Sequence, residues 1–113
     1  MLFINNLKNH NATRIQPVSL YQEHLQIIHT HDHCICVYFD KKSIFIYNSI
    51  HKNNLTEEQK VIIRALFIYV DKLSIEFSRV LQQPNFKDCA IYAMAYATSI
   101  FFHGDPEKIT YDI

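Results

Sequence analysis

Residues 25–47 read LQIIHTHDHCICVYFDKKSIFIY, and three short apolar runs inside this segment have the composition of β-strands. The runs cover residues 25–29, 34–39 and 43–47 and are rich in the β-branched and aromatic side chains that strands favour. Polar residues 40–42 make a tight connection between the second and third runs. The segment therefore predicts a meander of three strands.

The residues that follow change to a helical period. Thr56 followed three positions later by Gln59 forms a capping box, and the acidic pair at 57–58 suits the positive end of a helix. We therefore predict a helix over residues 57–70. Its apolar face is expected to consist of Val61, Ile62, Ala65, Leu66 and Tyr69.

The last third of the chain predicts one more strand and a second helix. Residues 73–83 alternate in polarity as a strand does, up to Pro84, and residues 89–102 are apolar on nearly every side, as a buried helix is. Asp88 is the expected N-cap, Gly104 the expected residue after the C-cap, and Pro106 could open a further turn. The apolar face of this helix is predicted as Ile91, Met94, Ala95, Thr98, Phe101 and Phe102, with Ala90, Ala93 and Ala97 on its other sides.

These elements, in the order β-β-β-α-β-α, predict an α+β fold in which about four strands of an antiparallel or mixed sheet pack on a buried helix carrying Cys89. The first two dozen residues are weakly patterned and indicate a loop or a short edge strand. A length of 113 residues is enough for a single hydrophobic core, so residues 1–113 are expected to form one domain.

Composition excludes several classes of function. Lys and Arg together number 11, as do Asp and Glu, so net charge points to neither nucleic acid nor a membrane surface as partner. One glycine cannot build a Walker loop or a dinucleotide-binding fingerprint. An odd count of three cysteines, without a secretory or bilayer-spanning apolar run, favours an intracellular protein of the cytoplasm or nucleus.

Four kinds of side chain needed by a thiol protease occur at suitable places. Cys89 opens a predicted helix, where the dipole and the unpaired backbone N–H groups favour a thiolate and could hold an oxyanion. His33 opens one strand and Asn48 closes the next, so a hairpin would bring a base beside a group that orients it. Gln82 and Gln83 point to opposite sides, so one of them could donate to the oxyanion.

The order of these parts resembles the ubiquitin-like-protein-processing cysteine proteases, the SUMO-protease or adenain-like family, over roughly residues 25–113. The residues that carry the resemblance are His33, the strand end at 47–49, Gln83 and the segment DCAIYA at 88–93. The resemblance implies a compact or truncated cysteine-proteinase-like catalytic domain, with Cys89 as nucleophile, His33 as base, Asn48 as orienting residue and Gln83 as oxyanion donor. It also implies hydrolysis of peptide or isopeptide bonds, with a ubiquitin-like modifier or its conjugate as substrate and no cofactor.

Three positions depart from the family's pattern of His-Trp, Asp, Gln and Asp-Cys-Gly. Asn48 stands for the Asp, Cys34 for the Trp that clamps a diglycine tail, and Ala90 for the Gly. The family's catalytic domain is also longer than 113 residues. These departures support an alternative function, in which a catalytically weak or inactive remnant of the protease fold binds a ubiquitin-like protein or has a structural role.

A zinc site is a second alternative. His29, His31 and His33 alternate along the chain and are followed by Cys34 and Cys36, and imidazole with thiolate suits zinc. His33 and Cys34 would lie on opposite faces of a strand, however, and no second cluster of ligands follows. The protease interpretation, which needs no metal, is therefore preferred.

Overall fold

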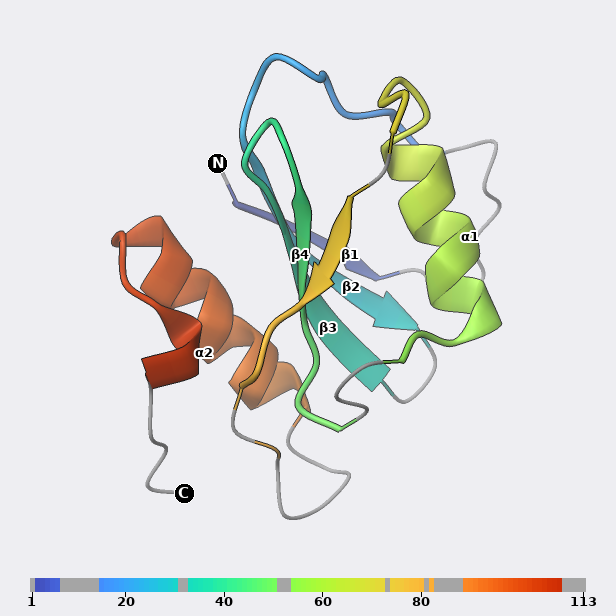
Figure 1. Cartoon of the computed structure of the whole chain (residues 1–113). Helices are drawn as coiled ribbons and strands as arrows, with labels where there is room; N and C mark the ends of the chain where they lie inside the picture. The colour runs from blue at the N-terminus through green and yellow to red at the C-terminus, as the bar shows by residue number, and fades with distance from the viewer. Residues whose placement is uncertain are drawn as a thin grey trace.

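The computed structural model describes residues 2–6, 15–30, 33–50, 54–72, 74–80, 82 and 89–108. Its centre is a five-stranded mixed sheet with α1 on one face and α2 on the other (Figure 1). The strands lie side by side in chain order and are β1 (Leu2–Asn6), β2 (His24–Thr30), β3 (His33–Phe39), β4 (Ile44–Tyr47) and β5 (Ile75–Phe77). The predicted α+β class is confirmed.

The three central strands form the predicted meander. β2 and β4 each pair with β3 in antiparallel register, whereas β1 runs parallel to β2 and β5 runs parallel to β4. β1 is the short edge strand expected near the N-terminus. The predicted strand at 73–83 is much shorter than expected, because only residues 75–77 find partners on β4, at an edge of the sheet.

Helix α1 (Glu57–Leu66) begins with the predicted capping box, in which the Thr56 hydroxyl accepts from the Gln59 amide and the Gln59 side chain accepts from the Thr56 amide. The helix ends four residues before the predicted end at residue 70. The amide of Val18 donates to the Leu66 carbonyl, the acceptor that the next helical turn would use. Val70 donates to Phe67 instead, so the chain leaves the helix there.

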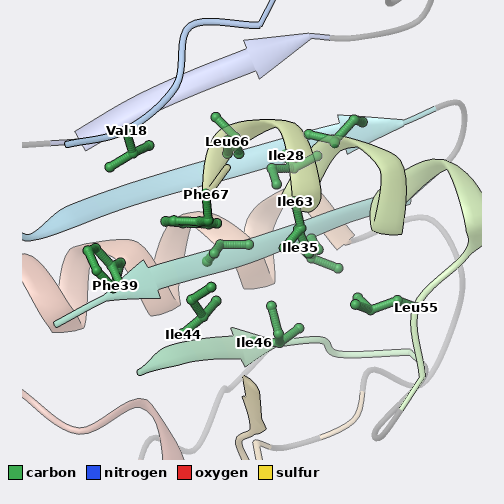
Figure 2. Close-up of a cluster of buried hydrophobic side chains, with 12 residues drawn as sticks. Val18, Ile28, Ile35, Phe39, Ile44, Ile46, Leu55, Ile63, Leu66 and Phe67 are labelled. Carbon is green, nitrogen blue, oxygen red and sulfur yellow. The ribbon is translucent and has the colours of Figure 1, made fainter. Parts of the chain in front are cut away.

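The buried face of α1 differs from the predicted one. Val61 and Tyr69 are 40% and 61% exposed, and Ala65 is partly exposed. The buried residues are Gln59, Ile62, Ile63 and Leu66. Figure 2 shows Ile63, Leu66 and Phe67 packed against Ile28, Ile35 and Ile46 of the sheet. This first cluster, which we call the aliphatic core, consists of Val18, Ile28, Ile35, Val37, Phe39, Ile44, Ile46, Leu55, Ile62, Ile63, Leu66 and Phe67.

Helix α2 (Cys89–Phe101) covers the opposite face of the sheet, and its orientation corrects the sequence analysis. Among the predicted apolar residues, Ile91, Met94, Phe101 and Phe102 are exposed. The residues that face the sheet are Cys89, Tyr92, Ala93, Tyr96 and Ala97. Because the helix is apolar on every side, hydrophobicity did not distinguish its faces. The side with two small alanines allows a close approach to the strands.

The second cluster, which we call the thiol face, fills the space between α2 and the sheet. It contains three cysteines and three tyrosines, and its members are Leu25, Ile27, Cys34, Cys36, Tyr47, Val80, Cys89, Tyr92, Ala93, Tyr96 and Ala97. Tyr96 lies near Tyr47 of β4 and Tyr92 of its own helix, with ring centroids 6.1 and 6.4 Å away. These contacts hold α2 across the middle of the sheet.

The C-terminal end of α2 closes with hydrogen bonds from His103 to Ile100 and from Gly104 to Ser99. The left-handed residue is His103, with φ of 62°, and not Gly104 as predicted. A 3-10 turn, η2 (Pro106–Lys108), then begins at the expected proline. Within the described ranges, neither helix has the length and apolarity needed to cross a membrane.

Candidate active site

His33 and Asn48 meet where β3 begins and β4 has just ended. The antiparallel register pairs Cys36 with Tyr47, so Asn48 lies diagonally across the two strands from His33 and on the same face of the sheet. The distance from His33 Nε2 to Asn48 Oδ1 is 3.0 Å, a hydrogen bond of ordinary length. The hairpin thus brings together two of the side chains singled out in the sequence.

Further hydrogen bonds fix the orientation of the Asn48 side chain. The amide N–H of Ile50 donates to Oδ1 at 3.0 Å, and Nδ2 donates to the carbonyl oxygen of Asn54 at 3.1 Å. A backbone N–H can only donate and a carbonyl can only accept, so the two ends of the side-chain amide cannot be exchanged. Oδ1 therefore faces His33 as an acceptor.

This orientation selects the tautomer of His33. Because Asn48 Oδ1 has no proton to give, the imidazole must donate from Nε2. In the neutral ring the proton is then on Nε2, and Nδ1 carries the lone pair. Nδ1 is shielded from solvent. The geometry leaves the ring with Nδ1 as its basic atom, which is the state a general base requires.

The surroundings of Asn48 explain why this position holds an amide and not a carboxylate. The side chain is fully buried and uses its N–H donor to hold the carbonyl of Asn54. A carboxylate in this place would set an oxygen against that carbonyl and lose the bond. Asn48 therefore suits this loop better than Asp, while still providing the acceptor that His33 needs.

Cys89 is the first residue of α2 and lies on the thiol face beside Cys34. The two thiols are in hydrogen-bonding contact, and each side chain is only 6% exposed. Burial, with the charge and hydrogen bond of Cys89 as further causes, raises the pKa of Cys34 to about 12. Cys34 directly follows His33 in β3, but the alternation of side chains turns the two residues to opposite faces of the sheet, so the contact of Cys89 is with the neighbour of the candidate base and on the other face.

The sequence analysis did not foresee the contact between Cys34 and Cys89. Cys34 had been considered there as the replacement for a tryptophan and as a candidate zinc ligand. The alternation of side chains along β3 was the available signal, since it turns Cys34 toward the face opposite to its neighbour His33. Recognising the contact also required knowing that α2 packs on that face.

The candidate oxyanion donor Gln83 and the predicted N-cap Asp88 lie outside the described residues. Gln82 is described, and its side-chain amide donates to the backbone carbonyls of Asn48 and Val80 at 3.0 and 3.1 Å. The bond to Asn48 holds the chain after β5 against the end of β4, whereas the bond to Val80 lies within that segment of the chain. Gln82 thus stabilises the backbone at Asn48. Gln83 stays the predicted oxyanion donor.

The zinc alternative assumed that three alternating histidines lie on one side of an extended strand, and the structure does not support this assumption. His29 is in β2 and His33 in β3, and the two strands are antiparallel, so these residues do not lie along one extended strand. His29 pairs across the sheet with Cys34, but no group of three potential metal ligands occurs among the residues that the structure describes. His31 lies outside those residues.

A cavity of about 190 Å³ lies at the other end of α2, away from these side chains. Its lining includes Ile100 and Phe101, and the helical rise places Phe101 roughly 18 Å along the axis from Cys89. The cavity is therefore separate from the candidate site.

Comparison with known proteins supports the fold. No protein-family model and no curated sequence matches the chain. Ten chains of solved structures do match, among them the SUMO protease Ulp1 with its catalytic cysteine oxidized to a sulfinic acid. The TM-score is 0.62 and the sequence identity 17%, over 79% of this chain and 45% of that chain.

This chain spans less than half the length of the Ulp1 structure that it matches. At 17% identity the similarity concerns the path of the backbone. The mixed sheet, with α1 on one face and the cysteine-bearing α2 on the other, is therefore similar in fold to the cysteine protease Ulp1.

Proposed function

We propose that this chain is a cysteine-type peptidase that hydrolyses peptide or isopeptide bonds of ubiquitin-like modifiers. Cys89 is the nucleophile, His33 the general base, Asn48 the residue that orients the base, and Gln83 the oxyanion donor. The observation that carries the proposal is the hydrogen bond from His33 Nε2 to Asn48 Oδ1, which leaves Nδ1 as the basic atom of a residue at the first position of β3.

The reaction follows from these groups. Nδ1 of His33 takes the proton of the Cys89 thiol, and the thiolate attacks the carbonyl carbon of the scissile bond. The backbone N–H of Cys89, with the Gln83 amide, would stabilise the oxyanion. His33 then gives its proton to the leaving amine, and water hydrolyses the thioester. Throughout, Asn48 accepts from Nε2 and stabilises the protonated ring.

The class of substrate rests on the fold similarity and the sequence pattern. The structural neighbour is a SUMO protease. The residues that carry the sequence resemblance are the ones that would cut peptide or isopeptide bonds to such modifiers. A protein substrate with an extended C-terminal tail is therefore the expected partner.

An activity-based probe tests the proposal. The chain would be incubated with the vinyl sulfones of SUMO and of ubiquitin, and adducts would be read by intact mass. We expect an adduct in the wild type that Cys89→Ser abolishes. Cys36→Ser is the matched control, because Cys36 lies on the same face of the sheet but is fully buried opposite Tyr47. Absence of an adduct with either modifier would refute the proposal.

A second function is favoured by the burial of the candidate nucleophile. A cysteine that is 6% exposed and packed on another thiol is also what a catalytically inactive protease-fold module would retain. Such a module would bind a ubiquitin-like protein without cutting it. Titration of the wild type with unmodified SUMO, followed by NMR or calorimetry, would show binding in the absence of any adduct.

A further inference from the structure

The thiol face contains a pair of cysteines that the catalytic proposal does not use as a pair. Cys34 and Cys89 come from different elements, β3 and α2, and their sulfur atoms are in contact. None of the three cysteines forms a disulfide in this structure. The two thiols in contact each retain a small exposed fraction, 6%, whereas Cys36 has none.

We propose that Cys34 and Cys89 form a reversible disulfide when the protein meets a hydroperoxide, which makes Cys34 a resolving thiol for Cys89. The pair joins a strand to the first residue of a helix. Formation of the bond requires the two sulfurs to approach from contact to bonding distance, a small movement for a residue at a helix end. The inference rests on the proposed function only where it concerns loss of peptidase activity.

The chemistry balances in two steps with hydrogen peroxide as oxidant. The Cys89 sulfur attacks one peroxide oxygen, the O–O bond breaks, and the products are Cys89 sulfenic acid and water. The Cys34 sulfur then attacks the sulfenic sulfur, the S–O bond breaks, and the departing hydroxide takes the Cys34 proton to leave as a second water. In total, two thiols and one peroxide give one disulfide and two waters.

The two cysteines are suited to different parts of this sequence. Burial and the neighbouring Cys89 sulfur raise the pKa of Cys34 to about 12, so Cys34 stays a thiol while Cys89 is reduced. Burial is the larger cause of the raised pKa of Cys34 and persists after Cys89 is oxidised, whereas the smaller contribution of the Cys89 charge is lost.

The contrast with Ulp1 shows what the second thiol would change. In that structure the catalytic cysteine carries a sulfinic acid. A sulfinic acid is not reduced by thiols, whereas a disulfide is. A resolving cysteine in contact with Cys89 would trap the sulfenic acid first, so oxidation of this chain would be reversed by a reductant.

Peptide mapping tests the proposal without requiring any activity. The reduced full chain would be treated with hydrogen peroxide, alkylated, and digested with trypsin. Cleavage after Arg14, Lys41, Lys87 and Lys108 places Cys34 and Cys36 in the peptide 15–41 and Cys89 in the peptide 88–108. We expect these peptides to be linked, lighter than their sum by a pair of hydrogen atoms, and separated by dithiothreitol.

Variants identify the resolving residue. Cys34→Ser is expected to lose the linked peptide and to accumulate Cys89 sulfinic acid, while Cys36→Ser keeps the link. Cys34→Ala serves as the second variant if the serine disturbs the fold, with circular dichroism before oxidation as the check. The proposal is overturned if the link survives in the Cys34 variants, depends on Cys36, or joins two chains on a non-reducing gel.

The outcome is independent of the peptidase assay. A linked peptide in a protein that forms no adduct with the vinyl sulfones would refute the peptidase and leave the thiol pair standing. An adduct without a linked peptide, with Cys89 oxidised to sulfinic acid, would refute the thiol pair alone. If both hold, peroxide-treated wild type loses probe labelling and regains it with dithiothreitol, whereas Cys34→Ser does not regain it.

Discussion

The two faces of the sheet differ in chemistry more than in size. The aliphatic core under α1 consists of isoleucine, leucine, valine and phenylalanine side chains without a polar atom. The thiol face under α2 contains the cysteines, three tyrosines and two alanines. Large branched side chains fill space and stabilise the fold, whereas small and polarisable ones let a helix terminus approach the strands. We infer that the aliphatic face supports the fold and that the thiol face positions Cys89, whereas His33 and Asn48 lie on the aliphatic side, at the end of the sheet.

The largest expected effect concerns the base. We expect His33→Ala to lower the turnover of a ubiquitin-like substrate by at least about 10⁴-fold, because the proposed acceptor of the Cys89 proton is removed. His24→Gln is the matched control, since His24 lies at the opposite end of the same hairpin. Single-turnover cleavage of a modifier fused at its C-terminus to a reporter measures both. Equal turnover of the two variants would remove His33 from the mechanism.

The next effect is on stability and belongs to the aliphatic core. Phe67 is 1% exposed and packs on Phe39 with ring centroids 5.3 Å apart. Phe67→Ala should lower the free energy of unfolding by about 3–5 kcal/mol in urea denaturation, with turnover per folded molecule unchanged. Phe102→Ala, on the exposed end of α2 at 74% exposure, should cost less than about 0.5 kcal/mol. A similar cost for both would contradict the burial of Phe67 in the aliphatic core.

Asn48 gives the next effect, which concerns both turnover and stability. Asn48→Ala should reduce turnover on the order of 10²-fold, because the His33 tautomer is no longer fixed. Asn48→Asp keeps the acceptor and therefore turnover, but it loses the bond to the Asn54 carbonyl and should cost about 1–3 kcal/mol in stability. The control Asn54→Ala leaves that carbonyl in place. The interpretation fails if Asp and Ala at position 48 reduce turnover equally.

The smallest effect is a pH dependence at the edge of the aliphatic core. Burial lowers the pKa of His24 below the ordinary value of 6.5, with Gln26 acting in the opposite direction. The unfolded chain therefore takes up a proton first as pH falls through about 6.5, and the folded state loses stability until the folded His24 is protonated as well. Above that pH the group contributes no pH dependence.

Thermal melting between pH 7.5 and 5 measures this loss. His24→Phe keeps a ring near Phe67 but cannot titrate, so its melting temperature should fall less than that of the wild type. An equal fall in both proteins would assign the acid sensitivity to the other histidines.

The sequence alone determined most of the local structure. The three central strands, the capping box at Thr56 and the start of α2 at Cys89 were predicted because each depends on residues close together along the chain. The meeting of His33 and Asn48 was predicted for a related reason, since a hairpin with a tight connection leaves little choice of register. The roles of Cys89 and Gln83 came from the order of residues along the chain and stay predictions.

Tertiary structure decided the features for which the local sequence patterns allowed more than one outcome. Every side of α2 is apolar, so only packing on β3 selected Cys89, Ala93 and Ala97 as its buried side. The end of α1 depended on Val18, far away in sequence, reaching the Leu66 carbonyl. The contact between Cys34 and Cys89 needed both the strand alternation and the choice of helix face. Long-range contacts of this kind depend on which surfaces fit together, and hydrophobic periodicity carries no information about fit.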